Sequence, residues 1–140
     1  MKTFIFISVV LCALVLGSVS WNSTAANDSQ KRRAVAAFDN PVTVQGVVLK
    51  GKYLFVHDDA AMARGEACTY IYKGQAEVRD KLVVSFHCIH LERAKSKHFM
   101  WRTREIVPGV VELEEFQFSG ETTAHGVPLV NNVAVVPLAN

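Results

Sequence analysis

The chain has 140 residues, half of them hydrophobic and a fifth charged, with a formal net charge of +2 at pH 7. A chain of this length holds one domain with a single core. Long-range attraction to nucleic acid needs a concentrated excess of basic residues, which this charge balance does not provide, so we expect no nucleic-acid partner.

The first twenty residues have the pattern of a secretory signal peptide. Lys2 is followed by the apolar run TFIFISVVLCALVLG, and small residues stand at Ser18 and Ser20. A membrane-spanning helix needs about 20 apolar residues, and this run is shorter. We therefore expect an exported protein, periplasmic or extracellular, without a stable membrane span once residues 1–20 are removed.

Residues 21–40 are polar and alanine-rich, and they show neither helical nor strand periodicity. This composition predicts a flexible arm ahead of the domain. The basic triplet KRR at 31–33 within it is interpreted as a solvated run of charge. A single β domain is then expected over residues 41–140.

Short runs rich in β-branched and aromatic residues fill that domain, separated by turn residues. They are VTVQGVVLK, YLFVHD, TYIYKG, KLVVSFHCIHL, FMWRTREIV, VVELEEFQFSG and VPLVNNVAVVPL. Runs of this kind at roughly ten-residue spacing are typical of all-β folds, and no segment has long helical periodicity. The sequence predicts a mainly-β fold, an antiparallel β-sandwich or small barrel of six to eight strands.

The stretch DDAAMARG predicts one short helical turn between two of these strands. Asp58 or Asp59 can cap the first amides, and Gly65 can take the left-handed conformation just past the end. A calcium loop would need oxygen ligands at positions that alanines occupy here. Both aspartates are therefore predicted to be structural.

Cys68 and Cys88 are the cysteines that follow the signal segment, and an exported protein with two cysteines favours a disulfide. Pairing CTYIYKG with KLVVSFHC as antiparallel strands places Cys68 opposite Cys88 and Tyr70 opposite Phe86. Thiol-redox centres usually have two cysteines close in sequence at a helix start, unlike this pair. We expect a structural Cys68–Cys88 bridge.

A transition-metal site is the alternative use of the polar residues near these cysteines. His57, His87, His90 and His98 could meet between neighbouring strands and bind copper or zinc. Ligand spacings such as HxH on a strand or HExxH on a helix are absent. The first expectation is therefore ordinary buried or surface histidines, with no metal and no cofactor.

The sequence shows no assembled catalytic group. Ser85 and His87 lie two residues apart, but a serine nucleophile needs a strained turn and an oxyanion hole, and no GxSxG is present. Carboxylates beyond the PG turn have a simpler interpretation. A hairpin there pairs Arg104 with Glu112 and Arg102 with Glu114 as cross-strand ion pairs.

The stretch ERAKSKHFMWR mixes basic and aromatic residues. It could hold an anionic glycan, a nucleic-acid strand or the acidic loop of a partner. Phe99 and Trp101 share one strand parity, which favours a polar loop leading into a strand whose aromatic side chains face the core.

The run VQGVVLKGKYLFVHDDAAMARGEACTYIYKG, together with KLVVSFHCIH, resembles small exported bacterial β-domain proteins of uncharacterised function. This resemblance implies a cell-envelope setting and brings no assigned chemistry. We expect an exported binding or structural module, not an enzyme, with an unknown ligand or protein partner. The alternative is a copper- or zinc-binding protein that uses the histidines at 57, 87, 90 and 98.

Overall fold

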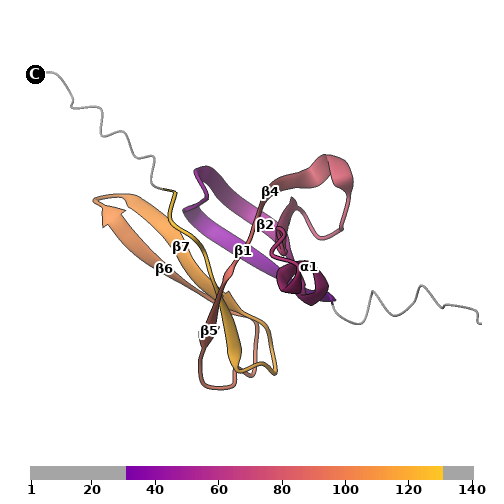
Figure 1. Cartoon of the computed structure of the whole chain (residues 1–140). Coiled ribbons are helices and arrows are strands. Elements are labelled where there is room, and N and C mark those ends of the chain that lie inside the picture. Colours follow the sequence, from indigo (N-terminus) through magenta and orange to yellow (C-terminus); the bar gives the residue numbers. More distant parts are fainter. Residues whose placement is uncertain (1–30, 131–140) are drawn as a thin grey trace, which may run out of the picture.

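The computed structural model describes residues 31–130, which form a mainly-β domain (Figure 1). The predicted signal peptide, the first half of the predicted arm and most of the last predicted strand lie outside the described residues. Among the described residues, no helix has the length and apolar character needed to span a membrane.

The elements follow one another along the chain as β1 (Lys31–Val44), β2 (Val47–Asp58), α1 (Asp59–Ala63), β3 (Thr69–Lys73), the 3₁₀ turn η2 (Arg79–Lys81), β4 (Leu82–Phe86), β5 (Ile89–Glu92), β6 (Met100–Val107), β7 (Val110–Gln117) and β8 (Thr123–Gly126). All eight strands belong to one sheet with the order β4-β3-β2-β1-β7-β8-β5, and β6 pairs with β7. Every pair is antiparallel except β1 with β7, so the sheet is mixed. The predicted mainly-β class and strand number are confirmed, in the form of one curled sheet resembling half a barrel.

The domain begins earlier than predicted, because residues 31–40 belong to β1 and not to an arm. Ala36 and Phe38 are buried in the main core, and β1 pairs with β2 from Lys31 onward. This strand was not predicted because its alanines and basic triplet lack a clear alternation of apolar and polar residues. The triplet is also ion-paired, as Lys31 and Arg33 contact Glu77.

Two predicted runs are each divided in the structure. VTVQGVVLK is a hairpin, in which Gln45 and Gly46 have φ values of 51° and 79°. Two successive positive φ angles are what a tight two-residue hairpin loop requires. KLVVSFHCIHL is divided at residues 87–88 into β4, which pairs with β3, and β5, which pairs with β8.

The register of β3 on β4 differs by one residue from the prediction. Thr69 lies opposite Phe86, and Tyr70 lies opposite Ser85. A one-residue shift turns each side chain to the other face of the sheet. Ile71 therefore enters the main core, while Tyr70 packs on a small cluster on the opposite face.

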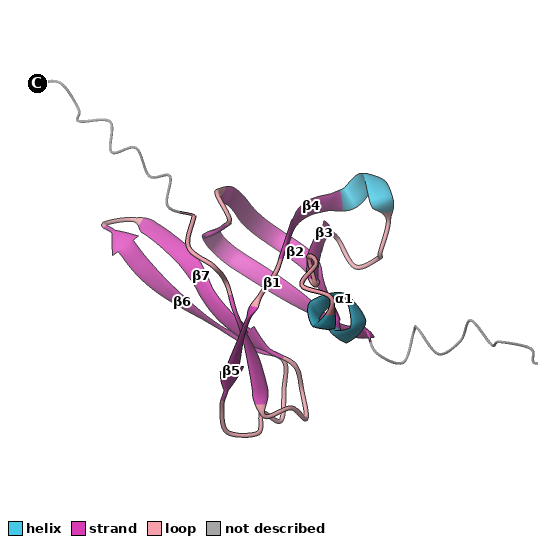
Figure 2. Cartoon of the chain, viewed as in Figure 1, coloured by secondary structure: helices cyan, strands magenta, loops and turns pink. Residues whose placement is uncertain are grey.

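The short helix and the PG turn agree with their predictions (Figure 2). Asp58 caps α1 by accepting a hydrogen bond from the amide of Ala61 at 3.0 Å, and Gly65 has a φ of 73°. In the β6–β7 hairpin, Arg104 lies opposite Glu112 as predicted. A bulge after Arg102 then shifts the ladder, so that Arg102 faces Glu115 and not Glu114.

The main core is strongly aromatic. Phe55 and Phe116 lie at its centre, fully buried, with ring centroids 5.2 Å apart. Phe99, directly before β6, packs against both rings. At one end this core passes into a group of buried polar residues, His57 and His125 among them.

Candidate metal centre

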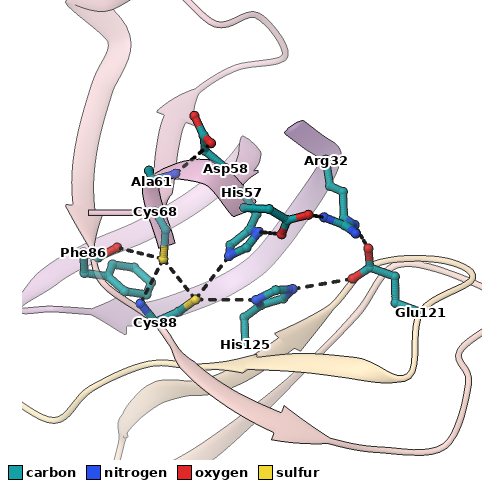
Figure 3. A network of polar contacts seen from close by, with 10 residues as sticks. Arg32, His57, Asp58, Ala61, Cys68, Phe86, Cys88, Glu121 and His125 are labelled. Carbon is teal, nitrogen blue, oxygen red and sulfur yellow. Dashed lines mark hydrogen bonds and ion pairs between the residues drawn. The ribbon is translucent and has the colours of Figure 1, made fainter. Parts of the chain in front are cut away.

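Three electron-pair donors from different parts of the chain converge at that end of the core. The Sγ of Cys88 lies 3.4 Å from Nε2 of His57 and 3.5 Å from Nδ1 of His125 (Figure 3). The three atoms all lie within 4.8 Å of one another, and none of the residues is more than 2% exposed. Histidine nitrogen and cysteine sulfur are the donor types that zinc and copper prefer in proteins.

The fold brings the three residues together from strands that are distant in sequence. His57 ends the buried part of β2, and His125 lies in β8 across from Phe116 of β7. Cys88 occupies the link between β4 and β5, where the chain crosses from one half of the sheet to the other (Figure 1). The cluster thus joins the β2 side of the domain to the β8 side.

The spacing of the donors fits a metal of ordinary size. A tetrahedral zinc with Zn–S of about 2.3 Å and Zn–N of about 2.05 Å places sulfur and nitrogen ligands about 3.6 Å apart. The two observed sulfur–nitrogen distances are 3.4 and 3.5 Å. The sulfur–nitrogen spacings therefore suit one bound ion, and the two nitrogens lie within 4.8 Å of each other.

Carboxylates stand behind both imidazole rings. Nδ1 of His57 lies 3.1 Å from Asp59, and Nε2 of His125 lies 3.5 Å from Glu121. The guanidinium of Arg32 contacts both carboxylates and holds them in one network (Figure 3). Metal-binding histidines commonly direct their outer ring nitrogen at a carboxylate, which fixes the ring and strengthens the inner nitrogen as a ligand.

This network corrects one prediction and adds to another. Asp59 was predicted to be structural, and its carboxylate contacts an imidazole of the cluster. Arg32 was assigned to a solvated run, yet it lies opposite His57 in the β1–β2 ladder. It shares strand parity with the core-facing residues Ala36 and Phe38, so its side chain points toward the polar end of the core.

Burial controls the protonation of the three donors. It lowers the pKa of His125 to about 3, with the neighbouring His57 as the next cause, and it also lowers the pKa of His57. For Cys88, burial and then the contact with Cys68 raise the thiol pKa to about 12. At neutral pH both rings are uncharged and the sulfur carries its proton.

Those protonation states leave more lone pairs than protons inside the cluster. When each ring directs its N–H toward its carboxylate, both inner nitrogens present lone pairs to the single S–H of Cys88, which can donate to only one. On the outer side of the rings, Nδ1 of His57 and Nε2 of His125 make no well-angled hydrogen bond within residues 31–130. A cation bound between the inner atoms would satisfy all three donors, whereas a neutral cluster leaves a buried polar atom uncompensated.

Cys68 lies beside the cluster on the far side of Cys88. The two sulfurs are 3.2 Å apart, and the amide of Cys88 donates a hydrogen bond to Sγ of Cys68 at 3.3 Å. The structure has both residues as free, buried thiols. The sequence correctly predicted that the two cysteines meet, and the covalent bridge itself stays a prediction.

Of the four histidines predicted as possible ligands, only His57 belongs to the cluster. His87 is exposed and contacts the carbonyl of Glu66 at 2.6 Å. His98 is exposed in the loop before β6. His90 is exposed as well, although it lies opposite His125 in the β5–β8 ladder.

His125 was missed because it stands in ETTAHGVP, a stretch of turn residues that predicts a loop. The structure places it in the four-residue strand β8, upstream of the last predicted strand. Its aromatic surroundings give no local signal either, since Phe116 stacks on its ring from β7 at 5.2 Å.

An open cavity of about 370 Å³ connects the cluster with the surface. His57 and His125 line its floor, while His90 and Met62 stand nearer the solvent. These additional soft donors line a route by which a metal ion could reach the buried atoms.

The same residues also have the order of a thiol nucleophile, a base and an orienting carboxylate, namely Cys88, His57 and Asp59. A catalytic cysteine must be accessible and easily ionised. Cys88 is 2% exposed and its thiol pKa is raised to about 12. The burial of Cys88 therefore argues against a nucleophilic role.

A second cavity, of about 480 Å³, lies between the β5–β6 loop and the β6–β7 hairpin. The predicted basic and aromatic stretch lines it, with Lys97 and Trp101 at its wall. Its central charge is already paired, because Arg93 donates two hydrogen bonds to the carboxylate of Glu115, at 3.1 and 2.6 Å. Trp101 packs edge-on against Phe38 but is 37% exposed, so of the two aromatic residues predicted to face the core only Phe99 packs against it.

Comparison with known protein families, curated proteins and solved structures finds no match to this chain. The resemblance to small exported bacterial proteins stays a prediction.

Proposed function

We propose that this protein is an exported binding module that holds one copper or zinc ion with His57, Cys88 and His125. The observation that carries the proposal is the convergence of three buried soft donor atoms within 4.8 Å. The carboxylates of Asp59 and Glu121 behind the rings support it, because they supply the outer contacts that metal-bound imidazoles require.

This function combines the two expectations drawn from the sequence. A binding module of the cell envelope needed a ligand, and the metal alternative needed ligands that converge. A soft metal suits the donor set, since thiolate and imidazole select zinc, Cu(I) and related ions over magnesium or calcium. Holding the ion, and not turnover of a substrate, is the proposed activity.

The test is metal titration of the reduced protein under anaerobic conditions, with Zn²⁺ and Cu⁺ in separate experiments. We expect one ion per chain and a thiolate-to-metal absorption band when Co²⁺ replaces zinc. His125→Gln should weaken binding by a factor on the order of a hundred, because one of three ligands is lost.

His98→Gln is the matched control, since it removes an exposed histidine outside the cluster. It should bind metal as tightly as the unaltered protein. Uptake well below one ion per chain, or equal losses in the two histidine variants, would contradict the proposed function.

A further inference from the structure

Cys88 has neighbours that would use its sulfur in incompatible ways. On one side, His57 and His125 offer nitrogens at 3.4 and 3.5 Å. On the other side, the sulfur of Cys68 lies 3.2 Å away (Figure 3). A metal ion would draw on the first pair of neighbours, and a disulfide would use the second.

We infer that metal binding and disulfide formation exclude one another at Cys88, so that the oxidation state of the Cys68–Cys88 pair decides whether the centre holds a metal. This inference rests on the proposed function. A disulfide sulfur carries no thiolate charge and is a poor ligand, so the oxidised protein would keep only the two histidines. Two ligands fall short of the three or four that zinc sites use.

The backbone holds the two sulfurs ready to react with one another. The amide of Cys68 donates to the carbonyl of Phe86 at 3.1 Å, which fixes Cys68 against the end of β4. The amide of Cys88, two residues further on, donates to Sγ of Cys68 at 3.3 Å. Closure to the bonded distance of about 2.05 Å therefore needs side-chain movement of about 1 Å in total.

That movement takes the sulfur of Cys88 away from the ring of His125. Figure 3 shows Cys68 and His125 on opposite sides of the Cys88 sulfur. A position that bonds Cys68 is thus a worse position for a metal between the two rings. Formation of the disulfide thus removes the thiolate charge and moves the sulfur, and both changes weaken its interaction with the ion.

The oxidation is balanced by a small disulfide such as oxidised glutathione. Cys68 and Cys88 lose two protons and two electrons as their S–S bond forms, and the small disulfide accepts them and leaves as two thiols. Both cysteines are buried, so the exchange takes place before folding is complete or after local opening of the β4–β5 link.

Linkage makes the exclusion reciprocal. If the disulfide weakens metal binding, bound metal must oppose the disulfide by the same free energy. The metal-loaded protein should therefore resist oxidation, and the first event after export, oxidation or metal uptake, would set the state of the centre. Exported proteins meet oxidising conditions, so both events are accessible to this chain.

The experiment compares metal binding by the reduced full chain and by the same chain oxidised with glutathione disulfide and desalted. Peptide mass spectrometry verifies the Cys68–Cys88 bond. We expect the oxidised form to bind Zn²⁺ or Cu⁺ more weakly by a factor on the order of a hundred, with full recovery on reduction. Zinc-loaded protein should form the bond more slowly than metal-free protein.

Cys68→Ser separates the switch from a general effect of the oxidant. This variant keeps the three proposed ligands but cannot form the bond, so its metal affinity should be the same before and after oxidant, with an intact mass that shows an unmodified thiol. Cys88→Ser should bind poorly under both conditions.

The reduced and oxidised samples test different statements. Failure of the reduced protein to take up metal would remove the proposed function and this inference with it. Stoichiometric binding by the reduced protein, together with equal affinity in the verified disulfide form, would overturn the inference alone. Failure of the metal-free chain to form the bond during oxidative refolding would overturn it as well.

Discussion

Two of the cavities in the described part of the domain differ in how their charged and polar groups are satisfied. The larger cavity, beside β6, is rich in cationic side chains, but its central Arg93 is already paired with Glu115. The smaller cavity leads to His57 and His125, whose inner nitrogens face a sulfur that cannot satisfy both. A ligand site is therefore better indicated by electron-pair donors that converge without partners than by the volume or the charge of a cavity.

The largest expected difference between the two cavities is the effect of bound metal on the free energy of unfolding. A ligand that binds only the folded state at a hundred times its Kd raises the free energy of unfolding by about 2.7 kcal/mol. We expect zinc to raise the stability of the reduced protein by about this amount. Cys88→Ser should lose most of the increase, and denaturant unfolding with and without zinc measures it. An equal increase in the variant would argue against the centre.

The carboxylate behind His57 should matter less than the ligands but remain measurable. Asp59→Asn keeps the shape of the side chain and removes the charge that orients the ring. Outer partners of metal ligands typically contribute 10- to 100-fold in affinity, so we expect about tenfold weaker metal binding. Asp80→Asn, in the turn η2, is the matched control and should leave the affinity unchanged.

The Arg93–Glu115 pair in the larger cavity should affect stability without affecting metal binding. Arg93 lowers the pKa of the Glu115 carboxyl through its hydrogen bonds. Because the folded-state pKa lies below the unfolded value, the contribution is present above the unfolded pKa of about 4.3 and is lost as pH falls through the folded pKa.

Arg93→Met should therefore lower the free energy of unfolding at pH 7, and the difference from the unaltered protein should shrink in acid. Unfolding in denaturant at pH 7 and at low pH tests this, with metal titration as the second readout. A loss of metal affinity in Arg93→Met would show that the two cavities are not independent.

The smallest effect is expected at the exposed wall of the larger cavity. Lys97 is exposed, and substitutions of such residues usually change stability by less than about 0.5 kcal/mol. Lys97→Ala should therefore leave both stability and metal affinity nearly unchanged. A clear change in either quantity, measured by thermal unfolding or metal titration, would show that this cavity contributes to stability or to metal binding.

The sequence predicted the local elements well where side-chain chemistry acts over a few residues. The cap at Asp58, the left-handed Gly65 and the PG turn depend on neighbours within one turn of chain. The pairing of Arg104 with Glu112 followed from that turn, but the bulge after Arg102 could not be predicted. Bulges depend on how a strand bends over the core, which no local pattern encodes.

The prediction for the candidate site was partial for a related reason. The two cysteines and His57 were recognised by residue type, and the meeting of Cys68 with Cys88 was predicted from an assumed register. The true register is shifted by one residue, and the sulfurs meet because the chain turns away after Phe86. His125 carried no signal of its own, since its strand has only four residues.

Residue type and short-range periodicity by themselves determined that this chain forms strands, where the short helix α1 begins, and which soft donor atoms the chain carries. The tertiary structure decided which of those donors meet. His57 and His125 lie 31 and 37 residues from Cys88, and Arg32 reaches them from a segment that looked like an arm. Such contacts depend on the curvature of the whole sheet and on the crossing of the chain between its halves, and neither property resides in any short stretch of sequence.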